Sequence, residues 1–185
     1  MTYHLDSKLK IKNALLLIDI QEKIIKPIED KDLITKNAKK LLDAYQILDE
    51  NIFLSEQNPI KLGKTIPELL PEVGYKTIEK MEFSIVNNQE FNEELQKKKI
   101  TNLIVCGIET HICIQQSVLE LLKKGFEVFL ISDAMGSRQK LDHEISLKRM
   151  TNEGAILTTT ESIIFELCKT SNRKEFKEIS NIIKN

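Results

Sequence analysis

The sequence LIVCGIETHICIQQSVLELLKKG, residues 103–125, contains in order a strand, a turn and a helix. Its first five residues, 103–107, form a short apolar run that is typical of a buried strand. Residues 112–124 follow a helical pattern and end in Lys-Lys-Gly, a usual stop signal for a helix. A strand that runs directly into a helix is half of a β-α-β unit, so this segment predicts a parallel sheet.

The same alternation extends along the chain in both directions. We expect strands at residues 14–18, 52–54, 75–78, 103–107, 127–132 and 155–157. We expect helices at residues 32–49, 89–98, 112–124, 141–153, 162–169 and 173–184, with an irregular stretch marked by Pro59, Gly63, Pro67, Pro71 and Gly74. Alternating strands and helices predict a three-layer α/β fold, with helices on both faces of a parallel sheet. The length of 185 residues fits a single domain, 1–185.

Composition and charge narrow the function. The net charge of −1 gives no electrostatic reason to expect nucleic acid or an anionic membrane as a partner. The longest apolar runs are too short to cross a bilayer, and the N-terminal MTYHLDSKLK lacks the apolar core of a signal peptide. Three cysteines make a poor disulfide framework, so we predict a reducing, cytoplasmic location.

Chemically useful side chains follow several of the expected strands. In open α/β sheets, ligands bind beyond the carboxyl ends of the strands. The residues at those ends are Asp19, Glu56, Gln57, Glu79, Lys80, the segment from Gly107 to Cys113, and Asp133. An acid, a lysine and a cysteine are therefore expected at one edge of the sheet, outside the core.

Each of these three residues also has an ordinary structural interpretation. Asp19 could simply turn the chain, Lys80 could be a solvated surface lysine, and Cys113 could be a small buried apolar residue. The expected place of Cys113 in the first turn of a helix favours a thiolate there. The combination is more specific than any one member.

Three segments carry a resemblance to a known family. VCGIETHICI, residues 105–114, resembles the nucleophile segment of the isochorismatase-like cysteine hydrolases, which include nicotinamidases and N-carbamoylsarcosine amidase. ALLLIDIQEK, residues 14–23, resembles their first strand and its acid, and EKMEFSIV, residues 79–86, resembles their lysine segment. The resemblance therefore includes all three of the candidate residues.

The resemblance runs over nearly the whole chain, from about Asn13 onward. SEQNPIKLGKTIPEL, residues 55–69, and SDAMGSRQKLDHEISLKRMTNEGA, residues 132–155, are most similar to the isochorismatase domain-containing proteins of higher organisms and their bacterial relatives. The family implies a six-stranded parallel sheet with strand order 3-2-1-4-5-6. It also implies a catalytic triad of Asp19, Lys80 and Cys113. Lys80 would then span roughly 10 Å, two strand spacings, to reach the acid.

The resemblance also implies a mechanism, hydrolysis of an amide or ureido C–N bond of a small molecule. Cys113 would attack the carbonyl carbon, with Asp19 as base and Lys80 favouring the thiolate. The backbone N–H groups of Glu109 and Cys113 would stabilise the oxyanion, with a cis peptide bond at Ile108–Glu109. On the residues alone, Thr110 is a candidate cap for the helix that follows.

One segment departs from the nicotinamidases. They carry Asp-x-His-Pro after the second strand, where it supplies metal ligands, but here the segment is Glu56-Gln57-Asn58-Pro59. The histidines present, His4, His111 and His143, have no metal-ligand spacing. We therefore expect neither a catalytic metal nor another cofactor, and we consider nicotinamidase activity doubtful.

The remaining predictions concern the pocket and the assembly. Gln21, Gln57 and Phe83 are candidate substrate contacts, although Gln57 could satisfy its own loop and Phe83 could belong to the core. Ser137 is expected to cap a helix. Cys106 and Cys168 are expected to be buried and inert. As members of this family usually associate, a homo-oligomer, either a dimer or a tetramer, is predicted.

Other functions remain open at this point. A vinyl-ether hydrolase, as in isochorismatase itself, would use Asp19 without Cys113. A redox or peroxide-reducing thiol could pair Cys113 with Cys106, although a cysteine on a buried strand makes a poor resolving thiol. A binding module that has lost turnover is a further alternative.

Overall fold

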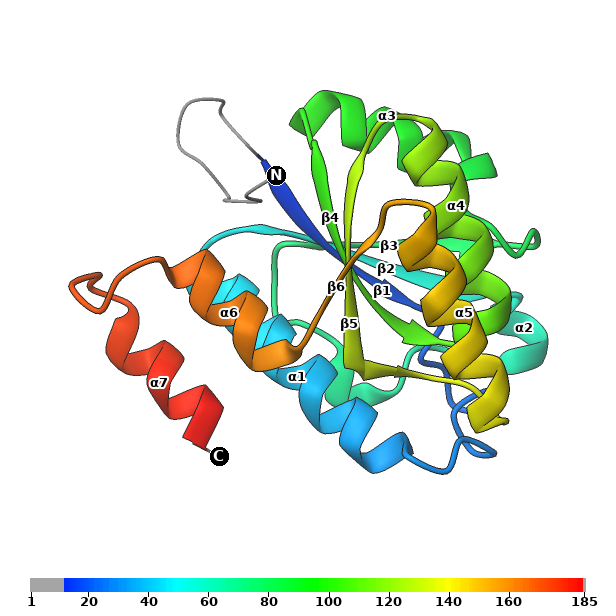
Figure 1. Cartoon of the computed structure of the whole chain (residues 1–185), viewed down its shortest axis with the longest axis horizontal. Coiled ribbons are helices and arrows are strands. Elements are labelled where there is room, and N and C mark those ends of the chain that lie inside the picture. The colour runs from blue at the N-terminus through cyan, green and yellow to red at the C-terminus, as the bar shows by residue number, and fades with distance from the viewer. Residues whose placement is uncertain (1–11, 185) are drawn as a thin grey trace.

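The computed structural model describes residues 12–184 (Figure 1). The whole MTYHLDSKLK segment, which includes His4, and Asn185 therefore lie outside the described residues. The strands are β1 Asn13–Ile18, β2 Asn51–Gln57, β3 Tyr75–Lys80, β4 Asn102–Ile108, β5 Glu127–Gly136 and β6 Ile156–Thr158. All five pairings are parallel, and the order β3-β2-β1-β4-β5-β6 confirms the predicted topology.

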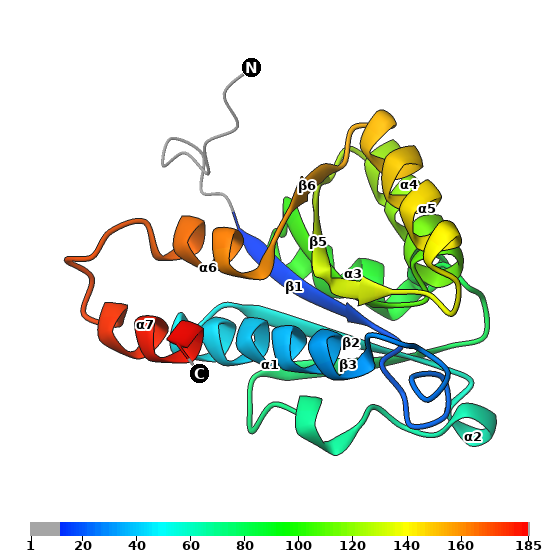
Figure 2. The ribbon, with the colours of Figure 1, turned by 60° about the horizontal axis from the view of Figure 1, so that its bottom comes forward.

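Helices cover both faces of this sheet (Figures 1 and 2). They are α1 Lys31–Ile47, α2 Pro59–Leu62, α3 Gln89–Lys98, α4 Gln115–Lys123, α5 Lys140–Asn152, α6 Thr160–Cys168 and α7 Phe176–Lys184. Alternate residues of β1 point to opposite faces. Leu15 and Leu17 pack in the core with α1 and α6, whereas Leu16 and Ile18 pack in the core with α3, α4 and α5. The three predicted layers are therefore present, with one apolar core on each side of the sheet.

Several strands run further than their apolar residues indicate. Pairing of β2 with β3 continues to Gln57 and Lys80, which lie opposite each other in the register. Backbone groups pair whatever side chain they carry, so the polar ends of these strands stay in the sheet. Lys80 thus belongs to a strand and not to the loop after it.

The helix predicted over residues 112–124 begins differently. A π turn, Thr110–Ile114, precedes α4, and Cys113 lies within this turn. Such turns contain one extra residue per hydrogen-bonded ring and are common at functional sites. The extra residue changes the direction in which the side chains before α4 point.

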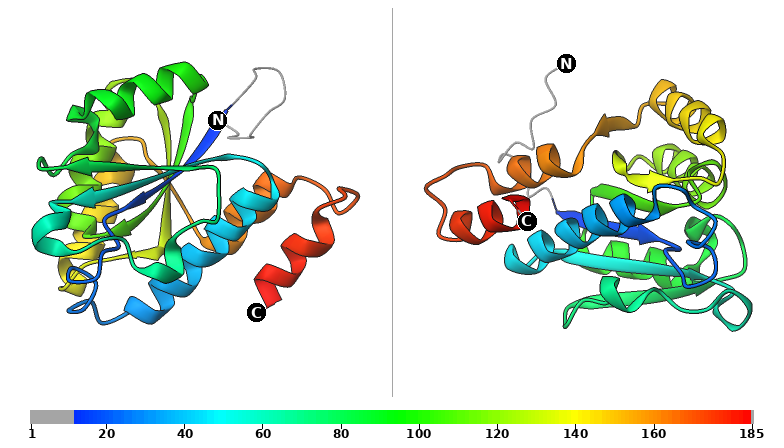
Figure 3. Two further views of the ribbon diagram at one scale, coloured as in Figure 1. Left: turned by 180° about the vertical axis from the view of Figure 1, so that it is seen from behind. Right: turned by 90° about the horizontal axis from the view of Figure 1, so that it is seen from below.

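The stretch between β2 and β3 is partly helical, with α2 and a 3₁₀ turn, Pro67–Leu69 (Figure 3). Glu56 fixes the middle of this stretch. One of its carboxylate oxygens accepts hydrogen bonds from the backbone N–H of Thr65 at 2.7 Å and from the hydroxyl of Thr65 at 2.9 Å. A second attachment is an isolated β-bridge between Gln21 and Thr65. This loop is therefore fixed beside the carboxyl end of β1.

The strand order reverses between β1 and β4. Asp19 follows β1 with a left-handed backbone angle φ of 53°, a conformation that costs energy for a residue other than glycine. Gly107 of β4 lies so close to β1 that an added Cβ atom would be 2.1 Å from the carbonyl oxygen of Ile18. The segments that carry Asp19 and Cys113 therefore leave the sheet from neighbouring strands. No helix within residues 12–184 is long and apolar enough to span a membrane.

Candidate active site

Asp19 and Lys80 form a buried ion pair. Lys80 Nζ lies 2.7 Å from Asp19 Oδ2, and the two side chains are 1% and 0% exposed. The hydroxyl of Ser55, on the intervening strand β2, donates to Asp19 Oδ1 at 2.6 Å. Lys80 therefore reaches Asp19 across the two strand spacings, as predicted. The expectation that Asp19 and Lys80 lie outside the core is wrong, because both side chains are buried. A charged pair at this depth is held rigidly by its hydrogen bonds.

Gln57 extends this network. Its Oε1 accepts a hydrogen bond from Lys80 Nζ at 2.8 Å, and its Nε2 donates to the carbonyl oxygen of Met81 at 2.7 Å. The side chain of Gln21 is fully buried and bonds to the backbone of Gln57, accepting from its N–H at 2.7 Å and donating to its carbonyl at 3.0 Å. Gln21 thus positions Gln57, which in turn orients the lysine.

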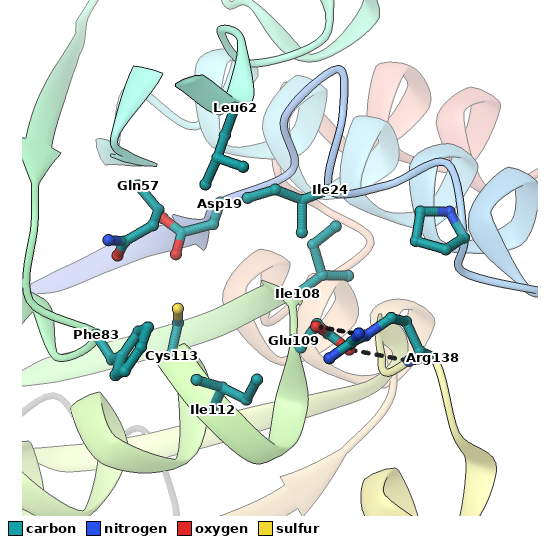
Figure 4. A pocket seen from close by; sticks show the side chains of 11 residues that line it. Asp19, Ile24, Gln57, Leu62, Phe83, Ile108, Glu109, Ile112, Cys113 and Arg138 are labelled. Atoms are coloured by element: carbon teal, nitrogen blue, oxygen red, sulfur yellow. Dashed lines mark hydrogen bonds and ion pairs between the residues drawn. The ribbon is translucent and has the colours of Figure 1, made fainter. Parts of the chain in front are cut away.

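A cavity of about 290 Å³ opens beside the ion pair (Figure 4). It is lined by Asp19, Ile24, Pro27, Gln57, Leu62, Phe83, Ile108, Glu109, Ile112, Cys113 and Arg138. Two of the three candidate substrate contacts, Gln57 and Phe83, lie on its wall, whereas Gln21 does not. Phe83 is half-exposed and so does not belong to the core. Most of the remaining wall is aliphatic.

Cys113 enters this cavity from the π turn. Figure 4 shows its sulfur pointing toward the side of the cavity where Asp19 and Gln57 lie. Burial raises the pKa of the Cys113 thiol well above its usual range, and the Asp19 carboxylate raises it further, while Lys80 acts in the opposite direction. The net direction is the reverse of the stabilised thiolate expected from the sequence. At neutral pH the sulfur therefore keeps its proton beside a carboxylate that could accept it.

The other two cysteines are remote from this chemistry. Cys106 lies within β4 and has no exposed surface, and burial raises the pKa of its thiol strongly. Cys168 ends α6 and is 2% exposed. Neither lines the cavity that Cys113 enters.

The peptide bond between Ile108 and Glu109 is cis. No described group accepts a hydrogen bond from the backbone N–H of Glu109. The side chain of Glu109 is paired with Arg138 (Figure 4). Arg138 Nε lies 3.0 Å from both carboxylate oxygens, and the backbone N–H of Arg138 donates to one of them at 3.1 Å. Arg138 was not among the candidate pocket residues, although it lies on the wall.

Both expected helix caps are wrong. Thr110 makes no capping hydrogen bond, and its hydroxyl lies 2.9 Å from Nδ1 of His143. Ser137 does not cap α5, and its hydroxyl lies 3.0 Å from Nδ1 of His111. The physical reason is the same for both: each hydroxyl faces a histidine from another segment and not a free N–H group of its own helix. His111 is partly exposed.

Two acidic residues at the sheet edge have structural contacts. The carboxylate of Asp133, in β5, accepts hydrogen bonds from the N–H of Thr160 at 2.8 Å and from the hydroxyl of Thr160 at 2.9 Å. Asp133 therefore binds the first residue of α6. The carboxylate of Glu56 is bonded to Thr65, as described above. Within residues 12–184 there is no cluster of three or more histidine, cysteine, aspartate and glutamate side chains that could hold a metal ion.

Sequence reasoning missed Ser55 and the aliphatic walls of the cavity. Ser55 follows directly after the apolar run of β2 and pairs with Ile18, the residue before Asp19. A parallel register between the first two strands would have placed its hydroxyl beside the acid. The walls, in contrast, include Ile24 from the loop after β1 and Leu62 from the short helix α2, and no periodic pattern in the sequence encodes the course of these segments.

Comparison with known proteins identifies the family of this chain. The model of the family described as "Isochorismatase domain" matches residues 13–162. Isochorismatase domain-containing protein 2 of Xenopus laevis is 37% identical over 172 residues, which are 92% of this chain and 83% of that protein.

Solved structures give the same result. The structure of MAR1 ribonuclease from Caenorhabditis elegans superposes with a TM-score of 0.89 at 34% identity, covering 94% of this chain and 90% of that one. The Escherichia coli YcaC gene product, described as an octameric hydrolase of unknown specificity, has a TM-score of 0.81 at 22% identity, with 94% and 92% coverage, which shows a shared fold. The predicted resemblance is confirmed, and the chain belongs to the isochorismatase family, whose hydrolase fold it shares.

Proposed function

We propose that this chain is a cysteine-dependent hydrolase that cleaves an amide or ureido C–N bond of a small molecule through a thioester. The observation that carries the proposal is the shared cavity, which both Cys113 and Asp19 line, with the sulfur pointing toward the side where Asp19 lies. A nucleophile next to a base that is itself held by a third group is the usual arrangement in covalent catalysis. Lys80 is that third group, at 2.7 Å from the carboxylate.

The first half-reaction uses the protonated thiol. As Sγ of Cys113 bonds to the carbonyl carbon, its proton passes to Asp19 and the carbonyl π electrons move to oxygen. Asp19 suits this role because Ser55 and Lys80 hold both of its oxygens in place. The amine of Lys80, which is 1% exposed, lies 2.7 Å from this base and would stabilise its charged form.

The oxyanion would be stabilised by the backbone N–H groups of Glu109 and Cys113. The N–H of Glu109 has no acceptor among the described residues, so it is available to a substrate oxygen. One such donor contributes about 10²- to 10³-fold to kcat in well-studied hydrolases.

The next steps complete acylation of Cys113 and then return the enzyme to its starting state. The C–N bond breaks as Asp19 gives its proton to the leaving nitrogen, which leaves an acyl thioester on Cys113. A water molecule then attacks the thioester carbon while Asp19 accepts its proton. The C–S bond breaks, the carboxylic acid leaves, and the proton returns to sulfur.

The cavity wall indicates the kind of substrate. A volume of about 290 Å³ suits a small molecule, and Ile24, Leu62 and Ile112 offer it an apolar surface. The half-exposed ring of Phe83 is positioned to contact the substrate at the mouth. The amide of Gln57 is held by Lys80 and Met81, so it would contact the substrate with a fixed orientation.

Ammonia release from a panel of small amides and ureido compounds tests the proposal. We expect activity in the native protein, none in Cys113→Ala, and an acyl adduct on Cys113 by mass spectrometry. Isochorismate and an RNA oligonucleotide belong in the panel as controls, since the family is named after isochorismatase and one solved relative is called a ribonuclease. Turnover of any compound that survives Cys113→Ala would contradict the thioester mechanism.

We also propose that the chain works as a homo-oligomer in the cytoplasm, without binding nucleic acid or membranes. The octameric YcaC product shares the fold, which supports self-association. All three cysteines are free and buried, as suits a reducing compartment. Sedimentation at micromolar concentration should give a species larger than the monomer, and a clean monomer would contradict the assembly.

A further inference from the structure

The hydroxyl of Thr110 depends on a distant helix for its hydrogen bond. Thr110 begins the π turn that carries Cys113, and it has no exposed surface. Its Oγ1 lies 2.9 Å from Nδ1 of His143 in α5, 33 residues later in the chain. A buried hydroxyl almost always has a partner. The position of this turn is therefore linked to the position of the imidazole.

On its C-terminal side the turn is held by Ser117, whose hydroxyl donates to the carbonyl oxygen of Cys113 at 2.6 Å. Neither the π turn nor α4 has a side-chain cap. The residues on either side of Thr110 are also tied to the segment that begins α5, since Arg138 pairs with Glu109 and Ser137 bonds to His111. Three consecutive residues, 109–111, which end two positions before Cys113, are thus held by a single segment, residues 137–143.

The direction of the Thr110 hydrogen bond depends on the charge of His143. Nδ1 accepts this hydrogen bond only in a neutral imidazole that carries its proton on Nε2, whereas the charged form must donate from Nδ1. Burial lowers the pKa of His143 below its usual value of 6.5, and this effect outweighs the nearby carboxylates of Glu144 and Asp30. The charged side chains that share a cavity of about 300 Å³ with His143 are Glu29, Asp30, Asp133, Arg138, Lys140 and Glu144.

We propose that His143 is a positioning residue for the reaction at Cys113. Its neutral imidazole accepts the hydrogen bond of Thr110 and holds the π turn so that the sulfur points at the substrate. The proposal rests on the proposed function, in which Cys113 is the nucleophile. When His143 is protonated the hydrogen bond must reverse, and the hydroxyl proton of Thr110 then has no acceptor among the described residues.

Alkylation of Cys113 by iodoacetamide, followed by mass spectrometry, reports on the sulfur without requiring turnover. His143→Leu removes the acceptor, and Thr110→Val removes the donor with little change of shape. We expect each variant to slow alkylation roughly 10- to 100-fold, the scale of a misplacement of about 1 Å. The double variant should be no slower than either single variant, because the two residues share one interaction.

The conservative variant His143→Asn retains a polar group near the position of Nδ1, and it should recover most of the rate. In the native protein the alkylation rate should fall about tenfold for each unit by which the pH is lowered, as the thiolate fraction declines. It should fall more steeply once the pH drops below the lowered pKa of His143, where the imidazole becomes charged. In His143→Asn the alkylation rate should fall about tenfold per pH unit over the whole pH range, without the steeper part. Lys148→Gln, an exposed change on the same helix, is the matched control.

Three results would overturn the proposal. They are a normal rate in folded His143→Leu, additive losses in the double variant, and identical pH profiles for the native protein and His143→Asn. If His143→Leu does not fold, Thr110→Val and the two pH profiles still decide. Failure of the proposed function would look different: the hydrogen bond would control alkylation while no amide was hydrolysed.

Discussion

Two ion pairs flank the cavity, and they differ sharply in burial. The side chains of Asp19 and Lys80 are 0% and 1% exposed, whereas those of Glu109 and Arg138 are 9% and 55% exposed. The shortest distance between nitrogen and oxygen is 2.7 Å in the first pair and 3.0 Å in the second. Distance alone therefore does not separate them, and the difference lies in how much water each pair has lost.

A substitution in the buried pair should therefore lower the free energy of unfolding much more than a substitution in the exposed pair. Removing one partner of a buried pair leaves an unpaired charge without solvent, while an exposed partner is replaced by water. The pair next to the nucleophile thus has a fixed geometry, as a base requires. The pair at the rim could rearrange around different substrates at little cost.

The largest expected effect is on stability, from Lys80→Met. This change leaves the carboxylate of Asp19 buried with Ser55 as its remaining side-chain partner, so we expect a loss of about 3–5 kcal/mol in the free energy of unfolding. Urea titration followed by circular dichroism measures it. The double variant Asp19→Asn/Lys80→Met, which removes both charges, should recover much of the loss.

A matched control comes from the surface of the same strand. Lys76 pairs with Glu90 at 2.8 Å, but both side chains are partly or largely exposed. Lys76→Met should cost less than about 1 kcal/mol. If Lys76→Met and Lys80→Met cost the same, burial would not be what distinguishes the two kinds of pair.

The next effect is on chemistry, from Asp19→Asn. Loss of the base should lower turnover about 10²- to 10⁴-fold. Alkylation of Cys113 should become faster at a given pH, because the Asp19 carboxylate raises the pKa of the thiol and Lys80, which remains, lowers it. Rates of ammonia release and of iodoacetamide labelling, measured on one preparation, give both numbers.

Opposite changes in turnover and labelling are what separate a base from a merely structural acid. Should Asp19→Asn label more slowly than the native protein, the carboxylate would not be acting on the thiol. In the native protein Cys113 should label before Cys106 and Cys168, since it alone lines the cavity. Earlier labelling of Cys168 would place the reactive thiol elsewhere.

The smallest effect is expected from Arg138→Gln. The guanidinium is mostly exposed, and the backbone N–H of Arg138 still donates to Glu109 after the change. We expect a stability loss of about 1 kcal/mol or less, measured by the same urea titration. A loss as large as that of Lys80→Met would show that the rim pair is as rigid as the buried one.

Much of this arrangement follows from the sequence. Apolar runs of strand length mark β1 and β4, and the rule that ligands bind at the carboxyl ends of strands points to Asp19 and Cys113. The depth of Lys80 could not be predicted in this way. Its burial depends on Gln57 and the loop after β2 closing over it, and neither residue pattern nor hydropathy records that contact.

The contacts around the π turn were also beyond sequence reasoning. A regular helix beginning near Ile112 would direct the side chains of Thr110 and His111 differently, and a hydroxyl near a helix start usually caps it. The extra residue of the π turn instead turns Thr110 toward His143. A contact between residues 33 positions apart leaves no trace in local periodicity.

The close approach of β4 to β1 has a consequence for how variants of this protein would be interpreted. Any side chain at position 107 would collide with the main chain of Ile18, at 2.1 Å from its carbonyl oxygen. In a saturation-mutagenesis library, substitutions there should disappear from the soluble fraction together, whatever their size or charge. An activity screen alone would score the position as if it were part of the chemistry. Counting folded molecules beside product would identify Gly107 as a point where two strands meet too closely for any side chain.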